Sequence, residues 1–393
     1  MTDATLRDVA RASGCSVATV SRVLAGTRPV GAETAARVRA AAAQLGYRPN
    51  HAARALRSRA TGTVGLVLPQ ITNPFYPTLV RALTHALHAD GRAVLLADCD
   101  DDPEAEAEHI ADLLARRVDA LLVIPAHERR SREAVAAAAA RVPLVLMDRG
   151  CGTGVADSVA VDNATGMALV LDHLAAVGRR RVCFIGAAGT ASAAAERRLA
   201  YESGAAALDP GAPDRVLLGD FSAEWGRAAV DELWESGPRD GEPGPEGEPG
   251  RCAPSGGGLP DALVCANDLI AIGALQRLQQ RGVDVPGQVA VTGFDDIPMA
   301  TLSAPGITTV RQPVSELAAE AARLLRRPPQ DGTRPHRTIR LAPDLVVRES
   351  SAARRQSGHS ARNEQDMTAQ QDVTAQQDMT AQQDLTAKVE EAQ

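Results

Sequence analysis

Short apolar runs alternate with alanine-rich stretches along the chain from residue 62 onward. The runs contain almost no polar residues, which is typical of strands buried on both faces of a parallel sheet. The stretches between them, such as 79–89 and 104–116, have the composition of helices. Buried strands that alternate with helices predict an α/β body with parallel, doubly wound sheets. The six clearest runs are TVGLVLP, AVLLAD, ALLVIP, PLVLMD, RVCFIG and ALVCAND.

The first 46 residues show a helical period instead. In TLRDVARASGC, Thr5 can cap a short helix, and Gly14 supplies the tight turn after it. In SVATVSRVLAG, Ser16 caps a second helix with one apolar face. A third helix runs from residue 32 to about residue 45 and is ended by Gly46. The side chains expected to pack are those of Leu6, Val9, Ala10, Val17, Val20, Val23, Leu24, Val38, Ala42 and Leu45, whereas Ala18 and Arg22 face outward.

Two short helices separated by a glycine-containing turn describe a helix-turn-helix, whose second helix enters the major groove of DNA. Arg22 can bind a guanine through a bidentate pair of hydrogen bonds. Ser16, Thr19 and Ser21 suit phosphate oxygens. Many small helical hairpins share this pattern, so the pattern alone is only moderately specific for DNA binding.

Charge is distributed unevenly along the chain. Residues 1–60 contain ten arginines and three acidic residues, whereas the whole chain has a formal net charge of −7. A basic module on an acidic body is the electrostatic pattern of polyanion binding. A solvated basic surface without a partner is the alternative that charge alone leaves open.

Several classes of protein are excluded by what the sequence lacks. No run approaches 18 apolar residues and the N-terminus has no signal-peptide pattern, so we expect a cytoplasmic protein. The six cysteines include no CxxC pair, and the eight histidines form no metal-binding spacing. The only lysine is Lys388, which excludes a Walker phosphate loop at FIGAAGT. We therefore expect no enzyme activity, no metal and no cofactor.

Polar and aromatic residues follow three of the apolar runs, at the strand ends where doubly wound sheets bind ligands. Carboxylates, an arginine and aromatic rings that converge on one cleft suit a polyhydroxylated ligand. A role in a turn or helix cap is equally expected for any single one of them. These residues are Asn73, Phe75 and Tyr76 after the first run, Asp148 and Arg149 after the fourth, and Asn267 and Asp268 after the sixth.

The stretches TLRDVARASGCSVATVSRVLAG and GYRPNHAARAL strongly resemble the DNA-binding headpiece of the LacI/GalR family of bacterial transcription regulators. The resemblance implies that Val17, Ala18 and Arg22 read bases in the major groove. The expected DNA contacts of the headpiece are therefore Thr5, Ser16, Val17, Ala18, Thr19, Ser21, Arg22 and Thr34. Gly31 stands where family members often have a polar cap.

The resemblance also implies a hinge helix, opened by Pro49 and Asn50, whose Leu56 wedges into the minor groove at the centre of the operator. Ala53 lies on the same helical face as Leu56. Arg57 and its neighbouring arginines suit phosphates, and an apolar wedge kinks DNA by unstacking one base step. An ordinary linker helix is the alternative.

The stretch from NDLIAIGALQRLQQRGVDVPG to TTVRQP resembles the C-terminal block of the same family. It implies a two-lobed body of the periplasmic-binding-protein type, whose lobes exchange strands and hold an effector between them. By that resemblance Asp268 holds ligand hydroxyls, Asp148 and Arg149 line the near wall, and Phe221 stacks. Arg197 matches the family's arginine in this cleft, although Ala200 stands where the family has glycine.

We expect a headpiece at 1–48, a hinge helix and linker at 49–61, and a body at 62–350 whose lobes are discontinuous in sequence. The segment 237–258 is a proline- and glycine-rich insertion, expected to be a flexible loop. The tail 351–393 repeats a six-residue unit that forms no coiled-coil stripe, so disorder or a fraying helix is expected.

The sequence thus predicts a repressor that binds palindromic operator DNA as a homodimer or tetramer and is switched by a small effector, with a sugar favoured. A corepressor-dependent regulator that responds to a nucleobase, and a cytoplasmic sugar- or nucleoside-binding protein, are the alternatives.

Overall fold

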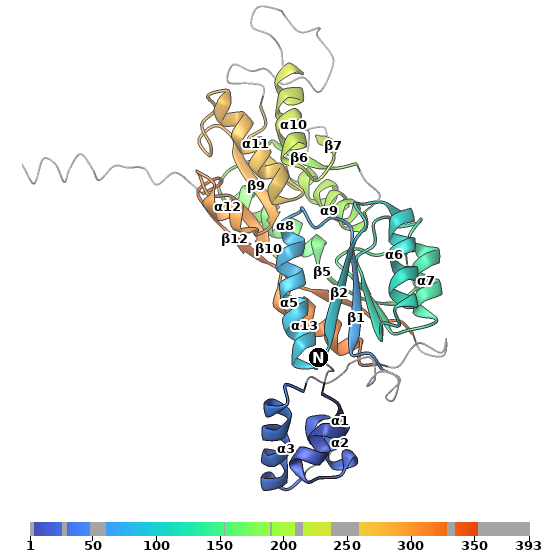
Figure 1. Cartoon of the computed structure of the whole chain (residues 1–393). Coiled ribbons are helices and arrows are strands. Elements are labelled where there is room, and N and C mark those ends of the chain that lie inside the picture. Colours follow the sequence, from blue (N-terminus) through green and yellow to red (C-terminus); the bar gives the residue numbers. More distant parts are fainter. Residues whose placement is uncertain are drawn as a thin grey trace, which may run out of the picture.

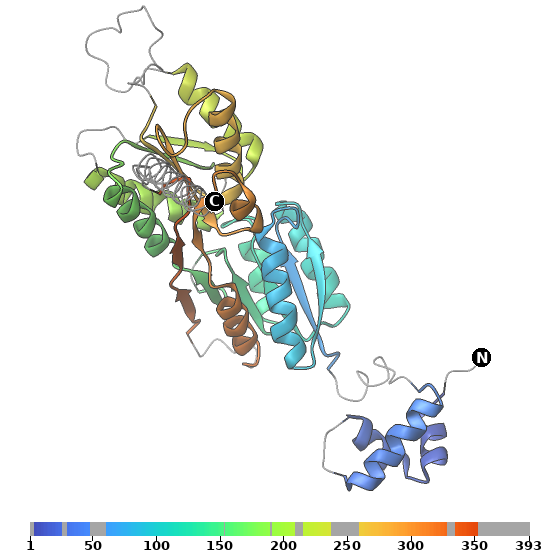
Figure 2. The same ribbon diagram turned by 90° about the vertical axis from the view of Figure 1, so that its left-hand side faces the viewer.

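The computed structural model describes residues 4–25, 30–47, 60–152, 154–188, 191–208, 215–236, 259–327 and 335–352. The expected hinge helix, the insertion at 237–258 and the tail beyond residue 352 therefore lie outside the described residues. The described parts form a helical headpiece and a body of two stacked lobes (Figure 1, Figure 2). The headpiece lies beyond the end of the first lobe at which β1 begins.

The headpiece consists of α1 (Leu6–Ser13), α2 (Val17–Ala25) and α3 (Ala32–Gln44). The Asp8 carboxylate accepts hydrogen bonds from the Thr5 backbone N–H at 3.0 Å and the Thr5 hydroxyl at 2.6 Å, which fixes the first turn of α1. Gly14 adopts φ +63°, a left-handed conformation that glycine tolerates best, and turns the chain toward α2. Ser16 Oγ accepts a hydrogen bond from the Thr19 N–H at 3.1 Å, as expected of a cap.

Val9, Val20 and Val38, one from each helix, are fully buried at the centre of the headpiece. Two of the expected core positions were wrong, because Val17 is 41% and Leu45 is 40% exposed. Both lie at helix ends, Val17 as the first residue of α2 and Leu45 as the C-cap of α3, where the chain reaches past the packed centre.

The body contains two six-stranded sheets, one in each lobe. The first lobe has the strand order β11-β5-β4-β3-β1-β2, with all neighbours parallel. The second lobe has the order β12-β10-β9-β8-β6-β7, in which β12 alone is antiparallel to its neighbour. The strands are β1 (Thr63–Leu68), β2 (Ala93–Asp98), β3 (Ala120–Val123), β4 (Leu144–Met147), β5 (Asp157–Val161), β6 (Val182–Ala187), β7 (Val216–Gly219), β8 (Ala262–Cys265), β9 (Ala290–Asp295), β10 (Thr308–Arg311), β11 (Thr338–Leu341) and β12 (Asp344–Val346).

Helices cover both faces of each sheet, as the apolar strands require. In the first lobe α6 and α7 lie on one face, and α5 and α13 on the other (Figure 1). In the second lobe α8 packs against α9, and α10 against α11. The helices are α5 (Phe75–Ala89), α6 (Pro103–Ala115), α7 (Arg132–Ala139), α8 (Asn163–Ala176), α9 (Ser192–Leu208), α10 (Ala223–Glu235), α11 (Asp268–Gln280), α12 (Pro298–Leu302) and α13 (Val314–Leu324).

The chain crosses between the lobes three times. The first crossover is at Asp162, between β5 and α8. The second is at 312–313, between β10 and α13, and the third is at 342–343, between β11 and β12. Each lobe is therefore assembled from separate stretches of sequence, and the expected two-lobed α/β fold is confirmed.

One strand departs from the sequence-based expectation. All six apolar runs form parallel strands, but AVLLAD, predicted as a buried strand, is the edge strand β2. Leu95 and Leu96 are 41% and 43% exposed because β2 has a neighbour on one side only. Among the described residues, no helix is both long enough and apolar enough to cross a membrane.

Candidate functional site

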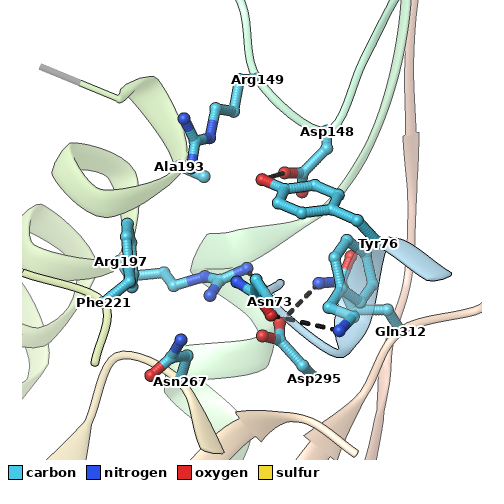
Figure 3. A pocket seen from close by; sticks show the side chains of 11 residues that line it. Asn73, Tyr76, Asp148, Arg149, Ala193, Arg197, Phe221, Asn267, Asp295 and Gln312 are labelled. Carbon is cyan, nitrogen blue, oxygen red and sulfur yellow. Dashed lines mark hydrogen bonds and ion pairs between the residues drawn. The ribbon is translucent and has the colours of Figure 1, made fainter. Parts of the chain in front are cut away.

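A pocket between the two lobes brings together residues from strand ends and helix starts of both sheets (Figure 3). Seven of the eight residues expected to bind an effector line it. Four further lining residues were not among those eight, and only Tyr76 of the four had been noted at a strand end. The lining residues are Asn73, Phe75, Tyr76, Asp148, Arg149, Ala193, Arg197, Phe221, Asn267, Asp295 and Gln312.

Asp268 is the eighth expected residue, and the structure does not place it in this pocket. It is fully buried at the start of α11, where its carboxylate accepts hydrogen bonds from Thr309 Oγ1 at 2.5 Å and the Ile297 N–H at 2.8 Å. Burial and the neighbouring Asp295 raise its pKa well above the ordinary value. Asp268 therefore joins α11 to β10 and the β9 loop, and the pocket carboxylate of this lobe comes from Asp295.

Arg197 projects from α9 into the pocket, where its guanidinium approaches Asp295 (Figure 3). Nε donates to Asn163 Oδ1 at 2.8 Å, Nη1 donates to the Ala266 carbonyl at 2.7 Å, and Nη2 lies 3.5 Å from Asp295 Oδ1. Cζ also lies 3.6 Å from the centre of the Phe294 ring. These contacts hold the side chain in one orientation.

Asp295 ends strand β9 and is 8% exposed. Burial raises its pKa to about 7, although the nearby Arg197 and the hydrogen bond from Gln312 oppose that rise. Gln312 Nε2 donates to Asp295 Oδ1 at 2.7 Å. A carboxylate that titrates near neutral pH in a pocket is a candidate for ligand recognition.

Arg149 follows strand β4 and lies across the same pocket from Asp295. Its side chain is buried, with only 6% exposure. Nη1 donates to Asp101 Oδ1 at 2.9 Å, and Cζ lies 5.9 Å from the Tyr76 ring centre and 6.0 Å from that of Phe221. Burial opposes the charge of Arg149, yet Tyr76, Asp101 and Asp148 keep its pKa above the ordinary value. The guanidinium therefore lies near aromatic rings of both lobes.

Two buried acceptor oxygens in this pocket have no hydrogen-bond donor among the described residues. Asp148 Oδ2 accepts the Tyr76 hydroxyl at 3.3 Å, but Asp148 Oδ1 is buried without a partner. Gln312 Oε1 is likewise buried and unpaired. Because an unpaired buried acceptor is costly, a ligand that supplies O–H or N–H groups here is favoured.

The two asparagines of the pocket offer the opposite chemistry. Asn73 Oδ1 accepts the Phe75 N–H at 3.1 Å, and Asn267 Oδ1 caps α11 by accepting the Ile270 N–H at 2.9 Å. Each carbonyl oxygen is thus engaged by the backbone, and each amide nitrogen is left as a donor. The pocket can therefore match both the donors and the acceptors of hydroxyl groups.

Backbone strain gathers at the edges of the pocket. Asp148 and Asp295 have φ angles of +59° and +112°, and Asp101, which pairs with Arg149, has φ +56°. Such conformations are uncommon outside glycine and cluster at functional sites.

The free volume of the pocket is about 20 Å³. Ligand pockets are usually on the order of 300 Å³ or more, so a sugar enters only if the lobes separate or side chains move.

The exposed face of α2 carries the expected base-reading residues. Val17, Ala18 and Arg22 are exposed, and Ser16 and Thr19 share a hydrogen bond of 2.9 Å beside them. Ser21 and Thr34 are partly exposed, and Thr5 is exposed in the cap of α1. Asn50, Ala53, Leu56 and Arg57 lie outside the described residues. Within the described part of the chain, no group of His, Cys, Asp or Glu side chains is arranged to hold a metal ion.

The sequence contained a signal for the missed residues. Two aspartates, DD, follow the apolar run AVTGF, and RQP follows TTV, so the strand-end argument that led to Asp148 applies equally to Asp295 and Gln312. Ala193 had no such signal, because it lines the pocket through its position at the start of α9.

Comparison with known proteins covers both parts of the molecule. Residues 5–50 match the family described as bacterial regulatory proteins, lacI family. Residues 61–241 match periplasmic binding proteins and sugar binding domain of LacI family, and residues 171–351 match the periplasmic binding protein-like domain.

Individual relatives match nearly the whole chain. It is 32% identical over 359 residues to the HTH-type transcriptional regulator GalR of Salmonella typhimurium (strain SL1344), which covers 91% of this chain and 98% of that protein. The lac repressor dimer bound to operator and the anti-inducer ONPF has a TM-score of 0.73 at 25% identity, over 90% of this chain and 100% of that one. The complex of the transcriptional regulator CelR with cellobiose has a TM-score of 0.61 at 30% identity, over 88% and 99%. Two of these relatives are transcriptional regulators, and the third is a repressor bound to its operator.

Proposed function

The chain belongs to the LacI/GalR family of bacterial transcription regulators. We propose that it is a repressor whose affinity for operator DNA is changed by a sugar-like effector that binds between its lobes. The observation that carries this proposal is the pocket itself. It joins a carboxylate and an arginine from each lobe with two unpaired acceptors and two amide donors. Effector binding then changes DNA affinity through its different affinities for two arrangements of the lobes.

The pocket chemistry favours a polyhydroxylated effector. Asp148 Oδ1 and Gln312 Oε1 accept hydroxyl protons, while the Phe221 and Tyr76 rings cover apolar faces. Cellobiose is bound by one relative of similar fold, which supports a sugar as the first candidate. We propose Asp295 and Arg197 as the principal contacts from the second lobe, in place of Asp268.

The headpiece supplies the DNA contacts in this proposal. Val17, Ala18 and Arg22 read bases from the exposed face of α2, and the hydroxyl-bearing residues near its start contact phosphates. The hinge residues, with Leu56 as minor-groove wedge, complete the interface. A cytoplasmic location follows from this role.

A homodimer fits the same proposal, because two headpieces read a palindrome. The edge strand β2 exposes Leu95 and Leu96, and α12 exposes Leu302 to 81%. Apolar side chains exposed in both lobes supply the kind of surface that a second copy buries.

The test is fluorescence anisotropy of the full chain on a DNA site selected from a random library. Cellobiose, monosaccharides, sugar phosphates, nucleosides and nucleobases are then titrated. We expect a sugar to release the protein. Tightening by a nucleobase would instead establish a corepressor-dependent regulator, and failure to select any DNA site would refute DNA regulation itself.

The pocket assignment has its own control in the same assay. We expect Asp295→Asn to lose the response to the active compound while operator affinity without that compound stays unchanged. Asp344→Asn, an exposed carboxylate at the start of β12, should behave as the unmodified chain does. An unchanged response in Asp295→Asn would show that the effector binds elsewhere.

A further inference from the structure

Arg197 is linked by side-chain contacts to all three crossovers between the lobes. Asn163, directly after the first crossover, accepts its Nε–H at 2.8 Å. Gln312, at the second crossover, reaches it through Asp295. Arg340, just before the third crossover, is connected through Glu196, the residue that precedes Arg197 on α9.

Glu196 and Arg340, here called the hinge pair, join opposite lobes. Arg340 lies on β11 of the first-lobe sheet, and Glu196 lies on α9 of the second lobe. Nη2 of Arg340 donates to Glu196 Oε1 at 2.7 Å, and Nη1 donates to Glu196 Oε2 at 2.9 Å. This bidentate fork is the most directional form of an ion pair, so one relative orientation of the lobes satisfies it best.

The same carboxylate also orients Asn163. Asn163 Nδ2 donates to Glu196 Oε2 at 2.7 Å, while Asn163 Oδ1 accepts from Arg197. Both ends of one amide are thus engaged, and the bond to Glu196 decides that the oxygen faces Arg197. Removal of the Glu196 acceptor would free the amide to rotate and would weaken the hold on Arg197.

An ordinary surface ion pair is the alternative explanation. The Arg340 and Glu196 side chains are 41% and 33% exposed, and exposed pairs contribute little to stability. The pair between Arg130 and Glu104 is of that kind, since both residues lie in the first lobe. The hinge pair differs because it spans the lobes and shares its acceptor with a residue that holds Arg197.

We propose that the hinge pair is a relay that sets the position of Arg197 according to the angle between the lobes. Glu196 and Arg340 are positioning residues in this relay, and neither lines the pocket. The effector role of Arg197 rests on the proposed function, whereas the relay itself concerns contacts within this chain. When the lobes rotate, the fork loses its geometry, Asn163 is released, and Arg197 gains freedom to leave Asp295.

The first test is hydrogen–deuterium exchange of the full chain without DNA or added ligand, so its outcome is independent of the regulator proposal. We expect Arg340→Gln and Glu196→Leu each to accelerate exchange in 161–166 and 192–198 by about fivefold, a coupling of ordinary size. The double variant should show no further acceleration, because the two residues act through one contact. Arg130→Gln, the matched control, should leave both segments unchanged.

The second test reports on Arg197 directly, through its rate of modification by phenylglyoxal, measured by peptide mass spectrometry. Arg197 is 3% exposed and should react slowly in the unmodified chain. We expect both single variants to speed its modification while thermal unfolding shifts no more than in the Arg130→Gln control. In the exchanged variant Glu196→Arg/Arg340→Glu, hydrogen exchange in 161–166 and 192–198 should become slow again. Arg197 should stay reactive toward phenylglyoxal, because this variant lacks the acceptor for Asn163.

Additive effects of the two single variants, or changes in Arg340→Gln that stay confined to the first lobe, would show an ordinary surface pair. Unchanged modification of Arg197 in Glu196→Leu, which has no acceptor for Asn163, would likewise overturn the relay.

Discussion

Burial raises the pKa of Asp295 to about 7 in the folded protein, against the lowering effect of the neighbouring Arg197. In the unfolded chain the same carboxyl titrates near its ordinary value of 3.8. Between roughly pH 4 and pH 7 the folded state therefore holds a proton that the unfolded state has released. The free energy of unfolding contributed by Asp295 falls as the pH rises through this window.

We therefore expect Asp295→Asn to flatten the pH dependence of stability, because asparagine imitates the neutral carboxyl. The variant should exceed the unmodified chain in free energy of unfolding at pH 8, by on the order of 1–4 kcal/mol, and the difference should shrink toward pH 5. Urea unfolding at pH 5, 6, 7 and 8 measures it, with Asp344→Asn as the exposed control. An unchanged slope in Asp295→Asn would show that Asp295 does not titrate in this window.

Arg22 carries the second prediction at this scale. It is exposed on α2, where its guanidinium can form a bidentate pair with a guanine. Arg22→Ala should weaken binding to the selected operator by about 1–3 kcal/mol and relax the preference at one base position. Anisotropy on a set of single-base operator variants measures both effects. Equal losses on the operator and on random DNA would assign Arg22 to phosphate contact instead.

Residue chemistry in the sequence was sufficient to place a ligand site at the strand ends, but not to choose among neighbouring carboxylates. Asp268 lies three residues beyond the buried strand β8, and Asp295 is the last residue of the buried strand β9. Asn267 caps α11, and this turn directs Asp268 toward Thr309 and away from the pocket. The rotation of a helix start relative to its sheet depends on packing that no local pattern records.

At the scale of elements, α10 and α11 approach each other through glycine. A Cβ atom built on Gly273 would lie 2.0 Å from the Ala223 carbonyl oxygen, which is backbone and cannot move aside. Helix propensity alone predicts that alanine stabilises a helical glycine position by about 0.5–1 kcal/mol. The close approach predicts the opposite sign.

We expect Gly273→Ala to lower the free energy of unfolding by roughly 1–3 kcal/mol, the usual cost of overpacking. Denaturant unfolding followed by the fluorescence of Trp225 and Trp234 on α10 measures it. Gly31→Ala is the control, because a Cβ there has no atom within 4 Å. Stabilisation of Gly273→Ala would mean that the two helices separate readily.

Element boundaries followed from local signals where a cap or turn was involved. Thr5, Gly14 and Ser16 delimit α1 and α2 as predicted, because their hydrogen bonds and φ angles are local. The exposure of β2 could not be predicted in this way. The apolar composition of β2 is that of a central strand, and only the order of strands in the sheet shows that β2 lies at the edge.

At the scale of the whole molecule, the apolar runs predicted parallel sheets but not two lobes with exchanged strands. That arrangement came from the family resemblance, because β11 joins the first sheet from a position more than 170 residues beyond β5. Pairing over such a distance has no local signature. The same arrangement leaves apolar side chains on the outside of both lobes, which bears on assembly.

Leu95 and Leu96 on the edge strand connect assembly to DNA binding. If two copies bury this strand, lysine at both positions places charges in the interface and separates the dimer. A palindrome gains affinity only when two headpieces are joined, so the loss of the dimer removes that gain.

We expect Leu95→Lys/Leu96→Lys to raise the dimer dissociation constant in sedimentation and to weaken palindrome binding by about a hundredfold or more. Binding to a half-site should stay unchanged. Leu199→Lys is the matched control, because Leu199 is 57% exposed on α9, which belongs to the second lobe, whereas β2 is the edge of the first-lobe sheet. A monomeric double variant that still binds the palindrome with full affinity would place the contact between headpieces elsewhere.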